Sequence, residues 1–212
     1  MIKRRIIINA DDFGLSLLFN KGILELAQKE IISSVSVMIN RNFVEAGAIE
    51  KFNKISLGLH LELSSRTTKE EIEDQIKKFV KEFKKLPSHL DGHNHCHLTL
   101  NNLPLVIKVA KQYKLPVRSH FDLDRQYIRK NNVKTPQSFI SWHPRRREDL
   151  FKTLKSIKIK TTVIELVCHP GYYDSQCQHS YNRQREVELK ILKSCEFKQK
   201  LKKFQLINYY EL

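Results

Sequence analysis

The stretch that decides the fold is Arg5-Ile6-Ile7-Ile8-Asn9-Ala10-Asp11-Asp12-Phe13-Gly14, close to the start of the sequence. Its apolar first half is short and continuous, which is typical of a strand buried on both faces of a parallel sheet. Two carboxylates follow directly, as polar residues do where such a strand runs out into a loop. The stretch therefore predicts a buried parallel strand with an acidic pair, Asp11 and Asp12, at its carboxyl end.

Beyond this first strand, strand-like and helix-like patterns alternate along the whole chain. Strand patterns lie at residues 34–39, 55–63, 87–91, 115–118, 161–168 and 205–209, and helix patterns lie at residues 19–29, 42–53, 65–83, 103–113, 146–155 and 184–193. Residues 119–144 have no clear period, and a connection of that length predicts a functional loop. Seven strands separated by helices predict a single α/β domain over residues 1–212, built on a parallel sheet.

Polar side chains recur where the predicted strands end. The pair Asp11 and Asp12, and then His60, His93 and His169, each follow the last apolar residues of a strand. In parallel α/β folds the carboxyl ends of the strands share one face, and active sites are built on that face. We therefore expect these acids and imidazoles to meet at one rim of the sheet.

A second dense motif is His89-Leu90-Asp91-Gly92-His93-Asn94-His95-Cys96-His97, which holds four of the nine histidines. If the segment is extended, its odd-numbered positions fall on one side of the strand. Imidazole and carboxylate are the ligand types of borderline divalent metals, and tracts of this density are typical of metal binding. The motif predicts a metal site.

The residue types at the strand ends also suggest a reaction. One carboxylate and two imidazoles make a three-ligand site with room for water, the arrangement of catalytic rather than structural metals. Consecutive side chains of an extended segment diverge, so one of the two adjacent acids would bind the ion while the other accepts a proton. A separate histidine would protonate the leaving group. The pattern predicts metal-assisted hydrolysis of an amide or ester.

Composition limits the possible partners and the location. The net charge of +15 invites an anionic partner, but the basic residues are dispersed and form no aromatic-studded basic strand, so no nucleic acid is expected. No apolar run reaches the ~20 residues of a membrane helix, and the N-terminus lacks a signal-peptide pattern. The four cysteines form no C-x-x-C pair and are expected to be free thiols. We expect a cytoplasmic protein without a membrane partner, with a homodimer left open.

Several blocks of sequence, in order, resemble the YdjC-like carbohydrate deacetylases, a family that includes the chitooligosaccharide deacetylases. They lie at residues 8–14, 58–61, 89–97 and 168–171, with less polar matches at residues 34–38 and 181–189. The resemblance implies a distorted TIM-like (β/α) barrel with about seven parallel strands. It also implies metal-dependent removal of acetyl groups from N-acetylglucosamine-type mono- or oligosaccharides, so the expected partner is a small carbohydrate substrate.

The resemblance assigns roles by position. Asp12, His60 and His93 would bind one divalent ion, Mg²⁺ or Zn²⁺, while Asp11 would be the general base and His169 the acid or an oxyanion stabiliser.

Four further residues would bind substrate or orient the metal ligands: Asp91, His95, His97 and Arg118. Of these, Asp91 and His97 are expected to orient the ligands, and Arg118 to hold substrate or pair with an acid. The chain departs from the family pattern at Asn94 and Cys96, and the segment between His60 and His93 is short. The length of the substrate is therefore left open.

Two other functions compete with this one. The His-x-His pairs at 93–95 and 95–97 would also suit a metal-dependent phosphoesterase or an amidohydrolase-like hydrolase, although amidohydrolases carry that motif at the first strand end. The positive charge would suit a phosphorylated substrate. A basic, non-enzymatic binder of anionic polymers is the other alternative, and it predicts binding that weakens steeply with salt.

Overall fold

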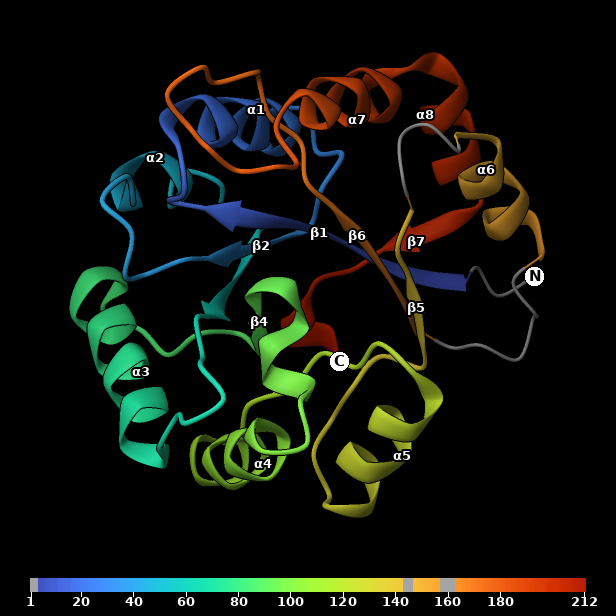
Figure 1. The fold of residues 1–212 in the computed structure, drawn as a ribbon. Coiled ribbons are helices and arrows are strands. Elements are labelled where there is room, and N and C mark those ends of the chain that lie inside the picture. Colours follow the sequence, from blue (N-terminus) through green and yellow to red (C-terminus); the bar gives the residue numbers. More distant parts are fainter. Residues whose placement is uncertain (1–3, 143–146, 157–162) are drawn as a thin grey trace.

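The computed structural model describes residues 4–142, 147–156 and 163–212, and its centre is one parallel sheet (Figure 1). The strands are β1 (Arg4–Phe13), β2 (Ser34–Val37), β3 (Ser56–Leu61), β4 (Leu90–Gly92), β5 (Ser138–Ile140), β6 (Val163–Cys168) and β7 (Phe204–Leu206). Their order is β4-β3-β2-β1-β6-β5, with β7 paired to the start of β1. All pairings are parallel, as the sequence predicted.

The sheet curves into a distorted barrel. Beyond β4, hydrogen bonding continues through Val117, which forms an isolated parallel bridge with Leu90. The N–H of Val117 in turn donates to the carbonyl of Lys134, a few residues before β5. Seven parallel strands with this irregular closure confirm the predicted TIM-like barrel.

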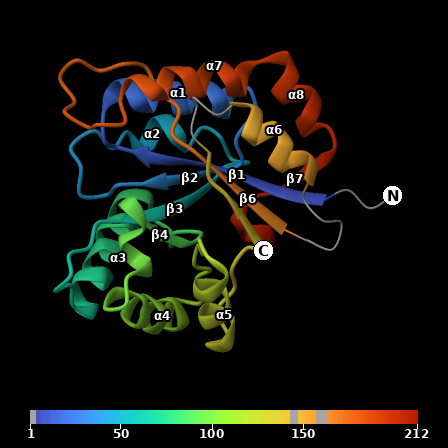
Figure 2. The same cartoon turned by 45° about the vertical axis from the view of Figure 1, so that its right-hand side comes forward.

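Helices cover the outside of the sheet, as the two views show (Figures 1 and 2). They are α1 (Leu17–Gln28), α2 (Ala46–Ile49), α3 (Lys69–Phe83), α4 (Asn102–Tyr113), α5 (Asp122–Lys130), α6 (Arg147–Ser156), α7 (Arg183–Lys193) and α8 (Cys195–Leu201), with the 3₁₀ segments η1 (His93–Leu98) and η3 (Tyr209–Glu211). Their buried apolar faces and the strands share one large core. No helix in the described ranges is both long and apolar enough to cross a membrane.

Residues 115–144 correct the sequence prediction. The expected strand at 115–118 is only the bridge at Val117, because its partner β4 is three residues long. The expected loop at 119–144 contains α5 and β5. Helix α5 is short and strongly polar, and its buried residues are Arg125 and Ile128, while β5 has three residues, so neither segment contains an apolar run. The sequence prediction of a loop at 119–144 therefore missed both α5 and β5.

Two other expectations were wrong in extent. The helix expected at 42–53 shrinks to the four residues of α2. The motif at 89–97 is extended only through β4, and then turns into η1 with Asn94 and His95 in the left-handed region (φ 51° and 56°). Its odd-numbered side chains therefore do not share one side. Residues 161–162 of the expected sixth strand and residue 146 of the expected fifth helix lie outside the described residues.

Two glycines position the active-site strands and loops by close approach. A Cβ on Gly58 of β3 would lie 2.1 Å from Cε1 of His89, and a Cβ on Gly22 of α1 would lie 2.6 Å from the Cα of Gly171. The first contact packs β3 against the start of β4. The second packs α1 against the loop that follows β6. Any side chain at either position would push these segments apart.

We expect Gly58→Ala to lower the free energy of unfolding by about 1–3 kcal/mol, the usual cost of overpacking a core. The added methyl group would displace His89, which stacks on Tyr209 at 3.6 Å and contacts Ser36 and Ser88. Gly47→Ala in α2 is the control, since a Cβ there meets nothing within 4 Å. It should be neutral or stabilising by up to about 1 kcal/mol. Urea unfolding curves measure both, and equal stability of the two variants would contradict the packing argument.

Candidate active site

The acidic pair lies at an irregularity near the end of β1. The register between β1 and β2 shifts between Ala10 and Phe13, and Asp12 has a left-handed φ of 70°. In a regular strand Asp11 and Asp12 would point to opposite faces of the sheet. The irregularity lets both carboxylates line the same cavity, where they face different partners.

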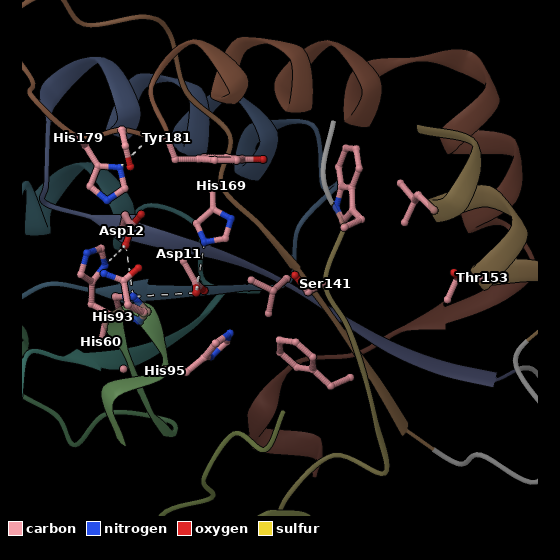
Figure 3. A pocket seen from close by; sticks show the side chains of 17 residues that line it. Asp11, Asp12, His60, His93, His95, Ser141, Thr153, His169, His179 and Tyr181 are labelled. Carbon is pink, nitrogen blue, oxygen red and sulfur yellow. Dashed lines mark hydrogen bonds and ion pairs between the residues drawn. The ribbon is translucent and has the colours of Figure 1, made fainter. Parts of the chain in front are cut away.

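Asp12, His60 and His93 come together as a possible metal-binding group (Figure 3). Oδ1 of Asp12 lies 3.2 Å from Nε2 of His60 and 3.1 Å from Nδ1 of His93. One ligand atom from each residue lies within 4.8 Å of the others. Two imidazoles and one carboxylate are a donor set that suits a divalent ion such as Zn²⁺.

The surroundings of His60 fit a bound cation. Its Nδ1 is 2.9 Å from Oδ1 of Asp91, which leaves Nε2 to face Asp12. A carboxylate behind a ligating imidazole fixes its tautomer in this way at many metal sites. Burial disfavours protonation of His60, but the charges of Asp91 and Asp11 outweigh it and raise the pKa well above its usual value. The site therefore attracts positive charge strongly.

Arg118 is the centre of a buried ion-pair cluster. Its guanidinium donates to both oxygens of Asp11 at 2.7 and 2.8 Å, and its Nε donates to Glu165 at 2.9 Å. Nη1 also lies 2.8 Å from Asp91. The side chain is fully buried, and all of these partners are acids.

These contacts set the charge of two acids in opposite ways. Burial alone would raise the pKa of Asp11, but Arg118 and His60 lower it below the usual value. Burial raises the pKa of Glu165 to about 7 in spite of Arg118. Asp11 is consequently an anion at neutral pH, whereas the pKa of Glu165 is raised toward neutrality.

Arg185 of α7 is a site residue that the sequence analysis did not single out. It is fully buried, lies over the ring of Phe19 at 4.0 Å, and donates to Oδ2 of Asp12 at 2.5 Å. Burial raises the pKa of Asp12, but Arg185 and the two imidazoles hold it well below its usual value. Arg185 thereby leaves Oδ1 of Asp12 as the oxygen that faces the histidines.

His169 is held by α7 as well. Its backbone N–H donates to Oε2 of Glu188 at 2.6 Å, and Tyr181 donates a hydrogen bond to Oε1 of Glu188. Nε2 of His169 lies 3.9 Å from Oδ2 of Asp11, so the two proposed proton carriers face each other (Figure 3). Glu188 is buried, and burial raises its pKa.

A sequence signal for these α7 residues did exist. Arg185, Glu188, Leu189 and Leu192 are all buried and follow the i, i+3, i+4, i+7 spacing of one helix face. Arg and Glu on an otherwise apolar face are informative, because such residues are rarely buried without partners. Neither the sequence spacing nor the family pattern, however, identified Asp12 and His169 as those partners.

His95 and His97 lie apart from the possible metal-binding group. His95 lines the cavity, but its ring packs beside His120 at 4.3 Å. His97 is buried, and its Nε2 lies 3.2 Å from the backbone carbonyl of Arg118. Its expected contact with a metal ligand is not found among the interactions of the described residues. All four cysteines are free, as expected.

The cavity has a volume of about 580 Å³, which falls within the range of small-molecule sites. Its polar side is formed by the acids and histidines described above. The opposite side is largely apolar and includes Phe139, Trp142, Leu150 and Val167. A reacting polar group next to an apolar wall is the arrangement expected for an enzyme pocket.

The fold and the site together describe an α/β-barrel hydrolase with a divalent-metal donor set. The family described as YdjC-like protein matches residues 5–70 and 65–203, and the chain belongs to this family. A carbohydrate deacetylase of Brevibacillus brevis is 30% identical, with 98% of this chain and 99% of that protein aligned. A chitooligosaccharide deacetylase of Proteus mirabilis is 29% identical, with 98% of each chain aligned.

A solved structure shares the fold. A protein of Enterococcus faecalis named for cellobiose-phosphate cleavage superposes with a TM-score of 0.83 at 24% identity, and 99% of each chain is covered. At this level of identity the likeness concerns the architecture alone.

The two adjacent acids should respond differently to substitution. Asp12→Asn should weaken the affinity for a divalent ion by at least about 10–100-fold, because loss of a residue that only orients a metal ligand already costs that much. Asp11→Asn should keep most of the affinity, because its carboxylate is turned toward Arg118 and His169. Calorimetric titration with Zn²⁺ measures both. If Asp11→Asn lost the metal and Asp12→Asn retained it, the two roles would have to be exchanged.

Proposed function

We propose that this protein is a metal-dependent carbohydrate deacetylase, which hydrolyses the acetamide of N-acetylglucosamine-type mono- or oligosaccharides. One observation carries the proposal: the donor set Asp12–His60–His93 and the facing pair Asp11–His169 line the same cavity. The named activities of the relatives, carbohydrate and chitooligosaccharide deacetylases, support the choice of reaction and substrate.

One divalent ion, Zn²⁺ or Mg²⁺, would be held by Asp12, His60 and His93. When bound, such an ion polarises a carbonyl and makes water more acidic. Two imidazole ligands favour Zn²⁺ by affinity, because Mg²⁺ prefers an all-oxygen shell.

Asp11 takes the role of general base in this proposal. Arg118 keeps it ionised, and its Oδ2 faces the cavity between His60 and His169, at 4.0 and 3.9 Å from their Nε2 atoms. An ionised carboxylate at that place can accept the proton of an attacking water. Because Arg118 is anchored by three acids, Asp11 keeps its orientation during proton transfer.

His169 takes the role of general acid. The amine of an amide leaves only when it is protonated, and Nε2 of His169 points toward Asp11 across the reacting space. Glu188 holds the backbone of His169, and Tyr181 holds Glu188. Both therefore act as positioning residues in the proposal.

The competing hydrolases have less support from the geometry. An amidohydrolase-like site needs both histidines of a His-x-His pair at the metal, but here His93 contacts Asp12 while His95 packs on His120. The group Asp11–His60–Asp91 could hold a second ion by distance, but the guanidinium of Arg118 already contacts both acids. The cytoplasmic location, the homodimer and the absence of a nucleic-acid partner stay predictions.

The proposed reaction is tested by acetate release. Purified protein with Zn²⁺ or Mg²⁺ added should release acetate from N-acetylglucosamine or its β-1,4-linked oligomers, and a chelator should abolish the release. p-Nitrophenyl phosphate is the control substrate, and we expect no phosphate from it. Phosphate release without acetate release would replace the deacetylase with the phosphoesterase.

Replacement of His169 separates the acid role from other roles. His169→Ala should slow amide hydrolysis by about 10²–10⁴-fold, the usual contribution of general acid–base catalysis. An activated acetyl ester needs no proton on its leaving group, so its hydrolysis should fall much less. Both rates are measured as kcat on the same preparation with metal content checked. Equal losses on the two substrates would remove His169 from the acid role.

A further inference from the structure

A row of aromatic rings leads from the cavity toward the surface. His95 lines the cavity, and its ring centroid lies 4.3 Å from that of His120. His120 stacks on Phe121 with a centroid distance of 4.2 Å and an interplanar angle of 14°. Phe139, another cavity residue, packs against His120 at 4.7 Å. The aromatic wall of the cavity is therefore continuous with Phe121.

Phe121 ends this row at the surface and is 64% exposed. One face of its ring is covered by His120, so the exposed part includes the opposite face and the edge. Phe121 therefore extends the aromatic wall of the cavity to the solvent.

The row is fixed in place from both ends. Oδ2 of Asp124 accepts the backbone N–H groups of Phe121 at 2.8 Å and His120 at 3.3 Å. At the cavity end, Asn94 and His95 both have left-handed backbones. Such conformations in non-glycine residues cost about 1–3 kcal/mol each and are concentrated at functional sites. The rings are thus preorganised, which favours binding.

His120, at the centre of the row, presents an uncharged ring near neutral pH, because burial lowers its pKa. An uncharged aromatic surface suits the apolar C–H face of a neutral sugar ring, whereas it offers no charge to a phosphate group.

We propose that His95, His120 and Phe121 form a second sugar subsite, which binds the next unit of an oligosaccharide whose N-acetyl group reacts in the cavity. The inference rests on the proposed function and narrows its substrate class to oligosaccharides. The exposed ring of Phe121 would pack on the outer unit, and the histidines would line the path between the two units.

The test compares Phe121→Ala with Leu123→Ala on tri-N-acetylchitotriose and on N-acetylglucosamine. Leu123 in the first turn of α5, two residues after Phe121, is 78% exposed and contributes no ring, so it is the matched control. Phe121→Ala should lower the ratio of kcat/KM for the trimer to that for the monomer by about three- to tenfold, the worth of one aromatic contact. The change should lie in KM, and Phe121→Trp should restore it. Equal ratios in Phe121→Ala and Leu123→Ala would overturn the subsite.

A binding measurement separates this inference from the deacetylase reaction. Trimer affinity is measured by calorimetry in the Asp11→Asn background with Zn²⁺ present, with and without Phe121→Ala. Weaker binding in the double variant supports the subsite even if no acetate is ever released. In that case only the proposed deacetylase reaction is contradicted. Unchanged binding overturns the subsite even if acetate release is confirmed. Thermal melting checks that the exposed substitution leaves the fold intact.

Discussion

The buried guanidinium of Arg118 is the interaction on which the rest of the site depends. It follows Val117, the bridge beside β4, and it joins Asp11 of β1, Asp91 of β4 and Glu165 of β6. Three acids this deep would repel one another without a central cation. Breaking a buried pair of this kind by removing one partner typically costs about 3–5 kcal/mol. The same contact therefore stabilises the barrel interior and aims Asp11 at the cavity.

Two arginines each bind one of the two adjacent acids, and they do so in different ways. Arg118 binds both oxygens of Asp11, whereas Arg185 binds one oxygen of Asp12 and leaves the other toward His60 and His93. Both pKa values are lowered, so both acids are anions. Oδ1 of Asp12, however, lies 3.2 and 3.1 Å from two imidazole nitrogens, whereas those nearest to Oδ2 of Asp11 are 3.9 and 4.0 Å away. The difference between the proposed ligand and the proposed base thus comes from the partners of two otherwise identical side chains.

The proposed catalytic groups lie at strand ends, but helices orient them. His169 follows β6, and its backbone is fixed by Glu188 of α7. The loop after His169 is in turn packed against α1, where Gly22 and Gly171 are in near contact. Helices on the outside of the barrel are therefore part of the site's rigidity. This matters because proton transfer is sensitive to small misplacements of donor and acceptor.

The sequence by itself determined the fold class and the chemical types of the site residues. Apolar strand patterns with polar residues at or near their ends, such as Asp11-Asp12, His60 and His169, predicted buried parallel strands that meet at a polar rim, and local patterning is enough for that prediction. Segments that are short or polar, such as α5 and β5, gave no such pattern.

Only the tertiary structure decided which residues act on one another. The irregular end of β1 brought both acids to one face, and the left-handed turn at Asn94 and His95 separated His93 from the other histidines of its motif. Arg185 and Glu188 reach the site from α7, more than 170 residues beyond Asp12 along the chain. Long-range contacts of this kind depend on how the helices pack on the barrel. No local pattern of apolar and polar residues records that packing, so the partners became visible only in the folded chain.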